Sequence, residues 1–274
     1  MKFRLIVVCL LASSVYGFSQ TRSELIKKAE ICFSKDDYES AEKFYKKAIE
    51  ISDPEYDKLY ILYTNLGTTQ RRNEKKKEAL ESYDIANSIK PNNVFILNNR
   101  ASLKRQLKDY YGALDDYGKS LEVDSLNEET LINRAHLYKV MCDTTLALKD
   151  LEKVLTFKPN SFPARNNIAD VQLNRGMYNE ALKTFNSLLY LNPNEPILFN
   201  NIAEVYIKKN EFKLALEYVN KALKVRKTYA CAYMTRGEIY MKMGDLKKAK
   251  KDFQKAIALD CEDERVFNYL DRCN

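Results

Sequence analysis

The 274-residue chain is poor in the residues that build catalytic and metal centres. Its one histidine, His136, has Ile132 and Val140 one helical turn away, which offer neither an acid nor a second metal ligand. None of the six cysteines forms a Cys-x-x-Cys pair, so we expect no zinc or other metal site. The seven glycines form no phosphate-binding loop. These absences predict a non-enzymatic protein with no cofactor and no small-molecule substrate.

Neither sign of charge dominates the sequence. Lysine and arginine number 45 against 38 acidic residues, which gives a net charge of +7, and the two signs are interspersed. A nucleic-acid-binding protein usually concentrates its basic residues on one face, whereas an evenly mixed surface mainly confers solubility. We therefore expect no nucleic-acid partner.

Long apolar runs are absent except at the start of the chain. There a short basic stretch precedes the 14-residue run LIVVCLLASSVYGF. A helix needs roughly 20 apolar residues to span a bilayer, so this run is short for an anchor. It fits a signal peptide over residues 1–19, with Gly17 and Ser19 at the −3 and −1 positions of the cut. A cut after Gly17 and an uncleaved anchor are the alternatives. We expect an exported protein, periplasmic or secreted, with no stable membrane span after cleavage.

What the sequence has instead is a repeat of 34 residues, visible as three series in one register. Small residues recur at Gly67, Ala101, Ala135, Ala169, Ala203 and Gly237; alanines recur at Ala79, Ala113, Ala147, Ala181, Ala215 and Ala249; bulky apolar residues recur at Tyr83, Tyr117, Leu151, Phe185, Val219 and Phe253. Each period contains two apolar helical faces separated by a short polar turn. A single hairpin cannot cover its own apolar face, so successive hairpins must stack.

This pattern resembles the tetratricopeptide repeat, which has 34 residues with a small residue at position 8, alanine at 20, an aromatic residue at 24 and proline at 32. Seven repeats begin near 22, 60, 94, 128, 162, 196 and 230, and a capping helix follows at 264–274. The resemblance implies an all-α, right-handed α-solenoid of seven hairpins plus this cap, in one domain over residues 20–274. The frequent Lys, Asn and Tyr, with the exit GFSQ, resemble envelope proteins of Bacteroidetes-type bacteria.

Asparagine, a poor helix former, recurs inside the predicted first helices. Position 6 carries Asn65, Asn99, Asn133, Asn167 and Asn201, and Asn98, Asn166 and Asn200 precede three of them. In tetratricopeptide superhelices of the O-GlcNAc transferase type, such a row lines the concave groove and holds an extended peptide, because an amide offers two donors and an acceptor to a backbone. We expect the three preceding asparagines to lie nearer the groove mouth. The alternative is that these amides bond a neighbouring repeat and serve stability.

Charged residues predict a groove that runs from basic to acidic along the chain. The basic residues are Arg71, Arg72, Arg105 and Lys139, and the acidic residues at position 9 are Asp170, Glu204 and Glu238. In the family, these positions face the groove. The dense basic run RRNEKKKEA, at 71–79, otherwise fits a solvated turn.

These features predict a non-catalytic module that holds a protein or peptide segment in its concave groove. The alternative is a structural subunit of a cell-envelope or secretion assembly, with permanent contacts on its convex surface and ends. A ligand held in the groove favours the first function, and co-purification in a stoichiometric complex favours the second.

Cys231 and Cys261 fall at the two ends of one predicted hairpin that lie together. A disulfide needs Cα atoms within about 7 Å, whereas the axes of packed helices already lie about 8–10 Å apart. The sequence therefore leaves this disulfide open.

One use of the family is predicted to be absent. Clamps for the C-terminal carboxylate of chaperones use three consecutive repeats. The first repeat carries Lys at position 5 and Asn at position 9, the second carries Asn at position 6, and the third carries Lys at position 2 and Arg at position 6. No three repeats here meet this pattern; repeat four, for example, has Glu129 and Asn133 in place of the last Lys and Arg. We expect no binding of an EEVD-type peptide, and a micromolar complex in calorimetry contradicts this.

Overall fold

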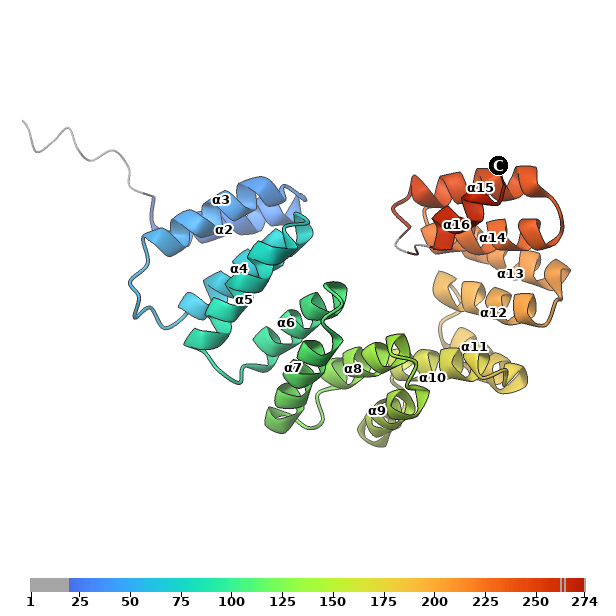
Figure 1. Ribbon diagram of the computed structural model, residues 1–274, viewed down its shortest axis with the longest axis horizontal. Helices are drawn as coiled ribbons and strands as arrows, with labels where there is room; N and C mark the ends of the chain where they lie inside the picture. The colour runs from blue at the N-terminus through green and yellow to red at the C-terminus, as the bar shows by residue number, and fades with distance from the viewer. Residues whose placement is uncertain (1–19, 262, 264, 274) are drawn as a thin grey trace, which may run out of the picture. The chain divides into compact units, whose positions relative to one another are not determined.

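The structure is a computed structural model that describes residues 20–261, 263 and 265–273 (Figure 1). The predicted signal peptide, residues 1–19, lies outside these described residues. All regular secondary structure in the described part is helical, in fifteen helices. They are α2 (Arg22–Ser34), α3 (Tyr38–Glu50), α4 (Leu59–Arg72), α5 (Lys76–Ile89), α6 (Val94–Gln106), α7 (Tyr110–Val123), α8 (Glu128–Val140), α9 (Thr144–Phe157), α10 (Phe162–Asn174), α11 (Tyr178–Leu191), α12 (Pro196–Lys208), α13 (Phe212–Val225), α14 (Ala230–Lys242), α15 (Leu246–Ile257) and α16 (Arg265–Asp271).

Helices α2 to α15 form seven successive pairs, each joined by a short turn, and α16 packs on α15. This confirms the predicted fold class of seven helical hairpins with a capping helix. The described residues up to Leu137 form one compact unit, and those from Tyr138 onward form a second. None of the described helices is long and apolar enough to cross a membrane.

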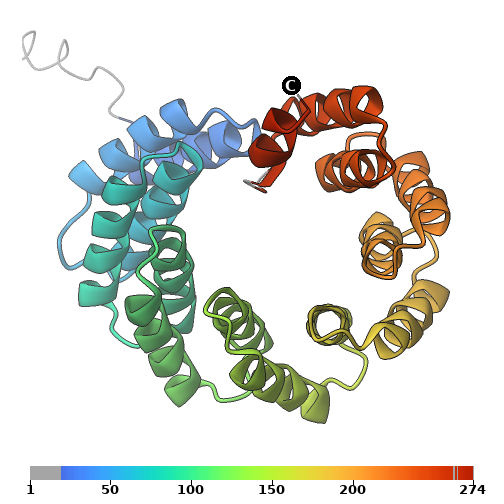
Figure 2. The same cartoon turned by 45° about the vertical axis from the view of Figure 1, so that its right-hand side comes forward.

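The two helices of a hairpin do not play the same part in stacking. In the first unit, first helices α4 and α6 contact each other directly, and in the second unit α12 contacts α14. Second helices instead pack on the first helix of the following hairpin, as α5 does on α6 and α13 on α14 (Figures 1 and 2). The first helices therefore make an inner layer in each unit, and the second helices an outer one.

Small residues on the first helices allow this close packing. A Cβ atom on Gly237 would lie only 2.5 Å from the Phe253 ring, and one on Gly67 would lie 2.9 Å from the Tyr83 ring. Both rings are completely buried. In each of these two hairpins, the residue at position 8 therefore packs directly on the ring at position 24.

Every hairpin turns through one residue with a left-handed backbone. These residues are Asp36, Glu74, Lys108, Cys142, Gly176, Asn210 and Gly244, with φ between 58° and 83°. In each case the next N–H bonds back into the first helix, as Lys75 N does to Gln70 O at 2.9 Å. This 6→1 bond ends the first helix, and it is formed whether or not glycine is present.

In the hairpins α6–α7 and α14–α15, an arginine forms an ion pair and also reaches the preceding hairpin. Arg100 on α6 donates two hydrogen bonds to Asp116 on α7, at 2.9 and 2.5 Å, and a third to Asp84 on α5, at 2.9 Å. Lys104 adds a contact of 2.9 Å to Asp116, whose side chain is fully buried. Arg236, Asp252 and Asn220 repeat the arrangement in the last hairpin, at 2.7 to 2.9 Å.

We expect Asp116→Ala to lower the free energy of unfolding by about 3–5 kcal/mol, because it leaves two largely buried cations without their partner. Asp115→Ala is the matched control. Asp115 pairs with Lys119 on the exposed side of α7, with both side chains about half exposed, so its loss should cost at most about 0.5 kcal/mol. Denaturant titration followed by circular dichroism measures both, and equal losses would contradict the buried pair's role.

Candidate functional site

The candidate site is the inner face, defined here as the surface of the first helices that carries repeat positions 6, 9 and 12. In the first unit it holds the position-6 amides Asn65, Asn99 and Asn133; in the second it holds Asn167 and Asn201. All five are partly exposed. The predicted amides are therefore accessible within each unit.

In the first unit, Asn99 bonds within its own helix. Its Nδ2 donates to Phe95 O at 2.9 Å, one turn back on α6. A carboxamide has a second N–H and an oxygen acceptor, so this bond uses only part of its capacity. Asn65 bonds the hydroxyl of Tyr45, the pKa of which burial raises to about 12.

In the second unit, the amides also bond across hairpins. Asn201 Nδ2 donates to Asn166 Oδ1 at 2.9 Å, which links α12 to α10. Asn167 Nδ2 donates to Pro163 O at 2.9 Å, and its Oδ1 accepts from Lys139 Nζ at 3.1 Å. These contacts favour a structural part for Asn167 and Asn201.

The expectation that the preceding asparagines lie nearer the groove mouth is wrong for two of them. Asn98 and Asn200 are only 5% and 3% exposed. One residue corresponds to about 100° around a helix, which turns these side chains toward a neighbouring helix. Asn98 Oδ1 accepts from Thr130 Oγ1 at 2.9 Å, while Asn166 remains partly exposed.

The predicted basic residues divide between the two units. Arg71 and Arg105 are partly exposed and Arg72 is exposed in the first unit. Burial raises the pKa of the Tyr117 hydroxyl to about 12, and the charges of Arg105 and Arg71 oppose this effect. In the second unit, Lys139 forms an ion pair with Asp170. Of the four basic residues predicted to face the groove, Lys139 therefore differs from the other three, because Asp170 of the next hairpin neutralises its charge.

Glu204 on α12 is the most perturbed acid of the inner face. Burial raises the pKa of its carboxyl to about 7, and the charges of Asp170 on α10 and Glu238 on α14 add to the effect. Arg265 of α16 and a 2.9 Å hydrogen bond from Asn200 Nδ2 oppose it. The sequence placed the three carboxylates at position 9, but it gave no sign of the burial or of the contribution of α16.

Asn200 presents a second feature that the sequence did not reveal. Its Oδ1 is buried and has no hydrogen-bond partner among the described residues. Buried polar atoms are nearly always paired in folded proteins. An acceptor without a donor therefore lies directly beside Glu204.

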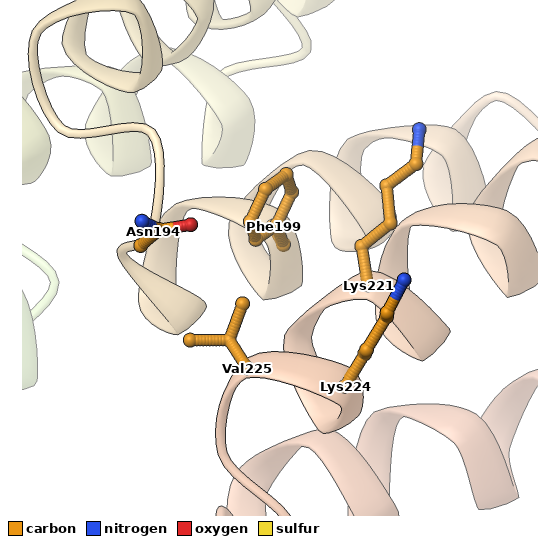
Figure 3. Close-up of a pocket in the computed structure, with 5 residues that line it drawn as sticks. All are labelled: Asn194, Phe199, Lys221, Lys224 and Val225. Carbon is orange, nitrogen blue, oxygen red and sulfur yellow. The ribbon is translucent and has the colours of Figure 1, made fainter.

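Two clefts lie beside predicted positions. One, of about 480 Å³, is lined by Asn194, Phe199, Lys221, Lys224 and Val225 (Figure 3). It contains none of the predicted residues, and Lys221 pairs with Glu217 at 2.6 Å. The other, of about 530 Å³ in the first unit, is lined by Asn92, Asn93, Val94, Phe95, Asn98, Val123, Asn127 and Glu129. Its Phe95 ring is 61% exposed, a feature that the repeat pattern does not indicate.

The described residues contain no group of three or more His, Cys, Asp or Glu side chains that could hold a metal ion. Cys231 and Cys261, the pair considered for a disulfide, are both free thiols. Burial and the proximity of Cys261 and Glu204 raise the pKa of Cys231.

Models of the tetratricopeptide repeat match residues 25–54, 162–195, 198–229 and 230–260. A crystal structure of a tetratricopeptide repeat protein from Parabacteroides merdae ATCC 43184 is 33% identical to the chain. It aligns over 93% of this chain and 99% of that one, with a TM-score of 0.82. None of the curated proteins matches.

Two more distant structures share the fold. PilW, a widely conserved type IV pilus biogenesis factor, is 18% identical over 77% of this chain and 98% of its own, with a TM-score of 0.62. The hetero-tetramer Cut9–Hcn1 of the APC/C contains a chain that is 14% identical over 96% of this chain and 58% of its own, with a TM-score of 0.63.

We expect Glu204→Gln to gain stability relative to the wild type as pH rises from 5 to 8. The pKa of Glu204 in the folded state lies above its ordinary value of 4.5. Between about pH 4.5 and 7 the folded state therefore binds this proton more tightly than the unfolded state does, so the wild type loses stability as the pH rises through this range. Between pH 5 and pH 8, the free energy of unfolding of Glu204→Gln relative to that of the wild type should rise by an amount on the order of 1–3 kcal/mol.

Denaturant titrations at pH 5, 6, 7 and 8 measure this difference. Glu180→Gln, on the exposed side of α11, is the control and should show the same difference from the wild type at every pH. If Glu204→Gln behaves like this control, the carboxyl of Glu204 is not perturbed.

Proposed function

The chain belongs to the tetratricopeptide repeat family, and on that basis we propose that it is a non-catalytic module that holds an extended segment of a partner protein along its inner face. The observation that carries this proposal is the row of partly exposed carboxamides at position 6 of successive first helices. Each unit presents its own part of the row, in the inner layer of helices. The group of the partner that these carboxamides bind is then its polypeptide backbone.

The chemistry of an extended segment fits these amides. Such a segment carries an unpaired N–H and C=O at every residue, and a carboxamide can donate to the one and accept from the other. Asn99 supports this best, because its bond to Phe95 O stays inside its own helix. The exposed Phe95 ring, one turn away, offers an apolar contact beside the same position.

A second candidate function is that of a structural subunit of a cell-envelope or secretion assembly. Exposed apolar side chains on second helices support it: Tyr111 on α7 is 80% exposed, and Tyr190 and Leu191 on α11 are 87% and 60% exposed. Large exposed rings are common at protein interfaces. From the sequence of the first nineteen residues we also propose that the protein is exported, which cell fractionation with N-terminal sequencing tests. If the protein co-purifies with partners in a stoichiometric complex, and substitutions on the inner face do not disrupt this complex, the result would favour the structural-subunit function.

We expect Asn99→Ala to weaken binding of peptides that the wild-type chain selects from a random library. The loss of one backbone hydrogen bond costs about 0.5–1.5 kcal/mol, or roughly 2- to 12-fold in Kd. Calorimetry measures the affinity, and the melting temperature should change little because no other hairpin loses a contact.

Asn186→Ala is the matched control, since Asn186 is exposed on the outer helix α11, and it should leave Kd unchanged. A well-folded Asn99→Ala variant with wild-type affinity removes the amide from the mechanism. A lower melting temperature, with affinity lost only through unfolding, supports the structural alternative instead.

A further inference from the structure

The inner face of the second unit carries three carboxylates on three successive first helices. They are Asp170 on α10, Glu204 on α12 and Glu238 on α14. Two of them already have a cation close by: Asp170 pairs with Lys139, and Glu238 lies 3.9 Å from Lys242. Glu204, between them, has no ion pair within 4 Å among the described residues, and its nearest polar contact is the Asn200 amide at 2.9 Å.

The cation whose charge acts on Glu204 is held by another group. Arg265 of α16 donates from Nη2 to Asp263 Oδ2 at 2.6 Å and from Nε to both Asp263 oxygens at 3.0 Å. Its guanidinium is thus committed to Asp263, although its charge still acts on Glu204. The position between Asp170 and Glu238 therefore has an excess of negative charge.

The buried oxygen of Asn200 is an independent sign of a missing donor. Asn200 is 3% exposed, its Nδ2 donates to Glu204, and its Oδ1 has no partner in the part of the chain that the structure describes. An unpaired buried acceptor costs free energy until a donor reaches it. The carboxylate without an ion pair and the acceptor without a donor are therefore neighbours on α12.

We propose that this position, the Glu204 site, receives a lysine or arginine side chain of the bound segment. The inference rests on the proposed function and names the partner's chemistry in the second unit. An ammonium or guanidinium group carries a positive charge together with several N–H donors in one group. It can pair with the Glu204 carboxylate and donate to Asn200 as well. A metal ion fits less well, because no three ligating side chains converge here within the described residues.

The acid–base state of Glu204 supports the same ligand. Among the described residues, Asp170 and Glu238 raise its pKa, Arg265 lowers it, and Tyr229 and Cys231 at the start of α14 also lie within electrostatic reach. With a pKa of about 7, the carboxyl is partly protonated at neutral pH. A bound cation favours the ionised form, so binding should release a proton.

The first experiment is a selection of random peptides by the mature wild-type chain, by Glu204→Gln and by the exposed-surface control Glu180→Gln. We expect lysine and arginine to be enriched at one peptide position by the wild type and the control, and the enrichment to be lost with Glu204→Gln while preferences at other positions remain. Equal enrichment with Glu204→Gln, or peptides selected without any basic preference, would overturn the Glu204 site and leave the proposed function intact. A wild-type chain that selects no peptide contradicts the proposed function itself.

The second experiment uses one selected peptide and its copy with the basic residue replaced by norleucine. Calorimetry on the wild type should show an affinity about tenfold or more lower for the copy, and Glu204→Gln should not distinguish the two. Between pH 6 and 8 the wild-type affinity for the basic peptide should rise about tenfold, as the ionised fraction of Glu204 rises. An affinity of the wild type that is independent of both pH and the replacement would refute the proposal.

Discussion

The contact between a small residue on a first helix and a large ring on its second helix sets how closely the layers of this protein approach. At Gly237 and Gly67 the ring lies where a Cβ atom would be. At positions 8, 20 and 24 this approach leaves no room for polar side chains, so these positions hold small residues and single large apolar or aromatic residues, all buried. Polar side chains lie elsewhere: some are buried with a partner, as Asp116 is, and the others lie on the surfaces of the two layers. The inner face is the part of that surface on which successive first helices bring their residues together.

Buried ion pairs add to the apolar packing between the inner and outer helices. Asp116 is completely buried, yet Arg100 and Lys104 both reach it, and Arg100 extends to Asp84 of the hairpin before. The guanidinium can do this because its N–H groups point in fixed, different directions. The same geometry around Arg236 shows that the arrangement belongs to a repeat position rather than to one site. On the inner face, Lys139 and Asp170 show the opposite consequence, in which a pairing across hairpins removes charges that would otherwise be available to a partner.

Some features of the candidate site follow from the sequence, and others do not. Position 6 carries partly exposed amides on five first helices, because a strict period of 34 places the same residue on the same face each time. The expectation for Asn98 and Asn200 was wrong, because helical geometry turns them into the interface between helices. The ion pair between Lys139 and Asp170 could not be foreseen, since it depends on which side chains meet across hairpins. The unpaired Asn200 oxygen is likewise a property of packing, not of any motif.

The sequence by itself determined the repeat, the number of hairpins and the residues that pack inside each one. These follow from local periodicity and from the need of every hairpin to cover its apolar face. Only the tertiary structure decided which polar side chains on that framework remain accessible. The pKa of Glu204 illustrates the difference, because it arises from burial on α12 together with charges contributed by α10, α14 and α16. Electrostatic interactions depend on distances between residues far apart in the chain, and those distances exist only after the hairpins have stacked.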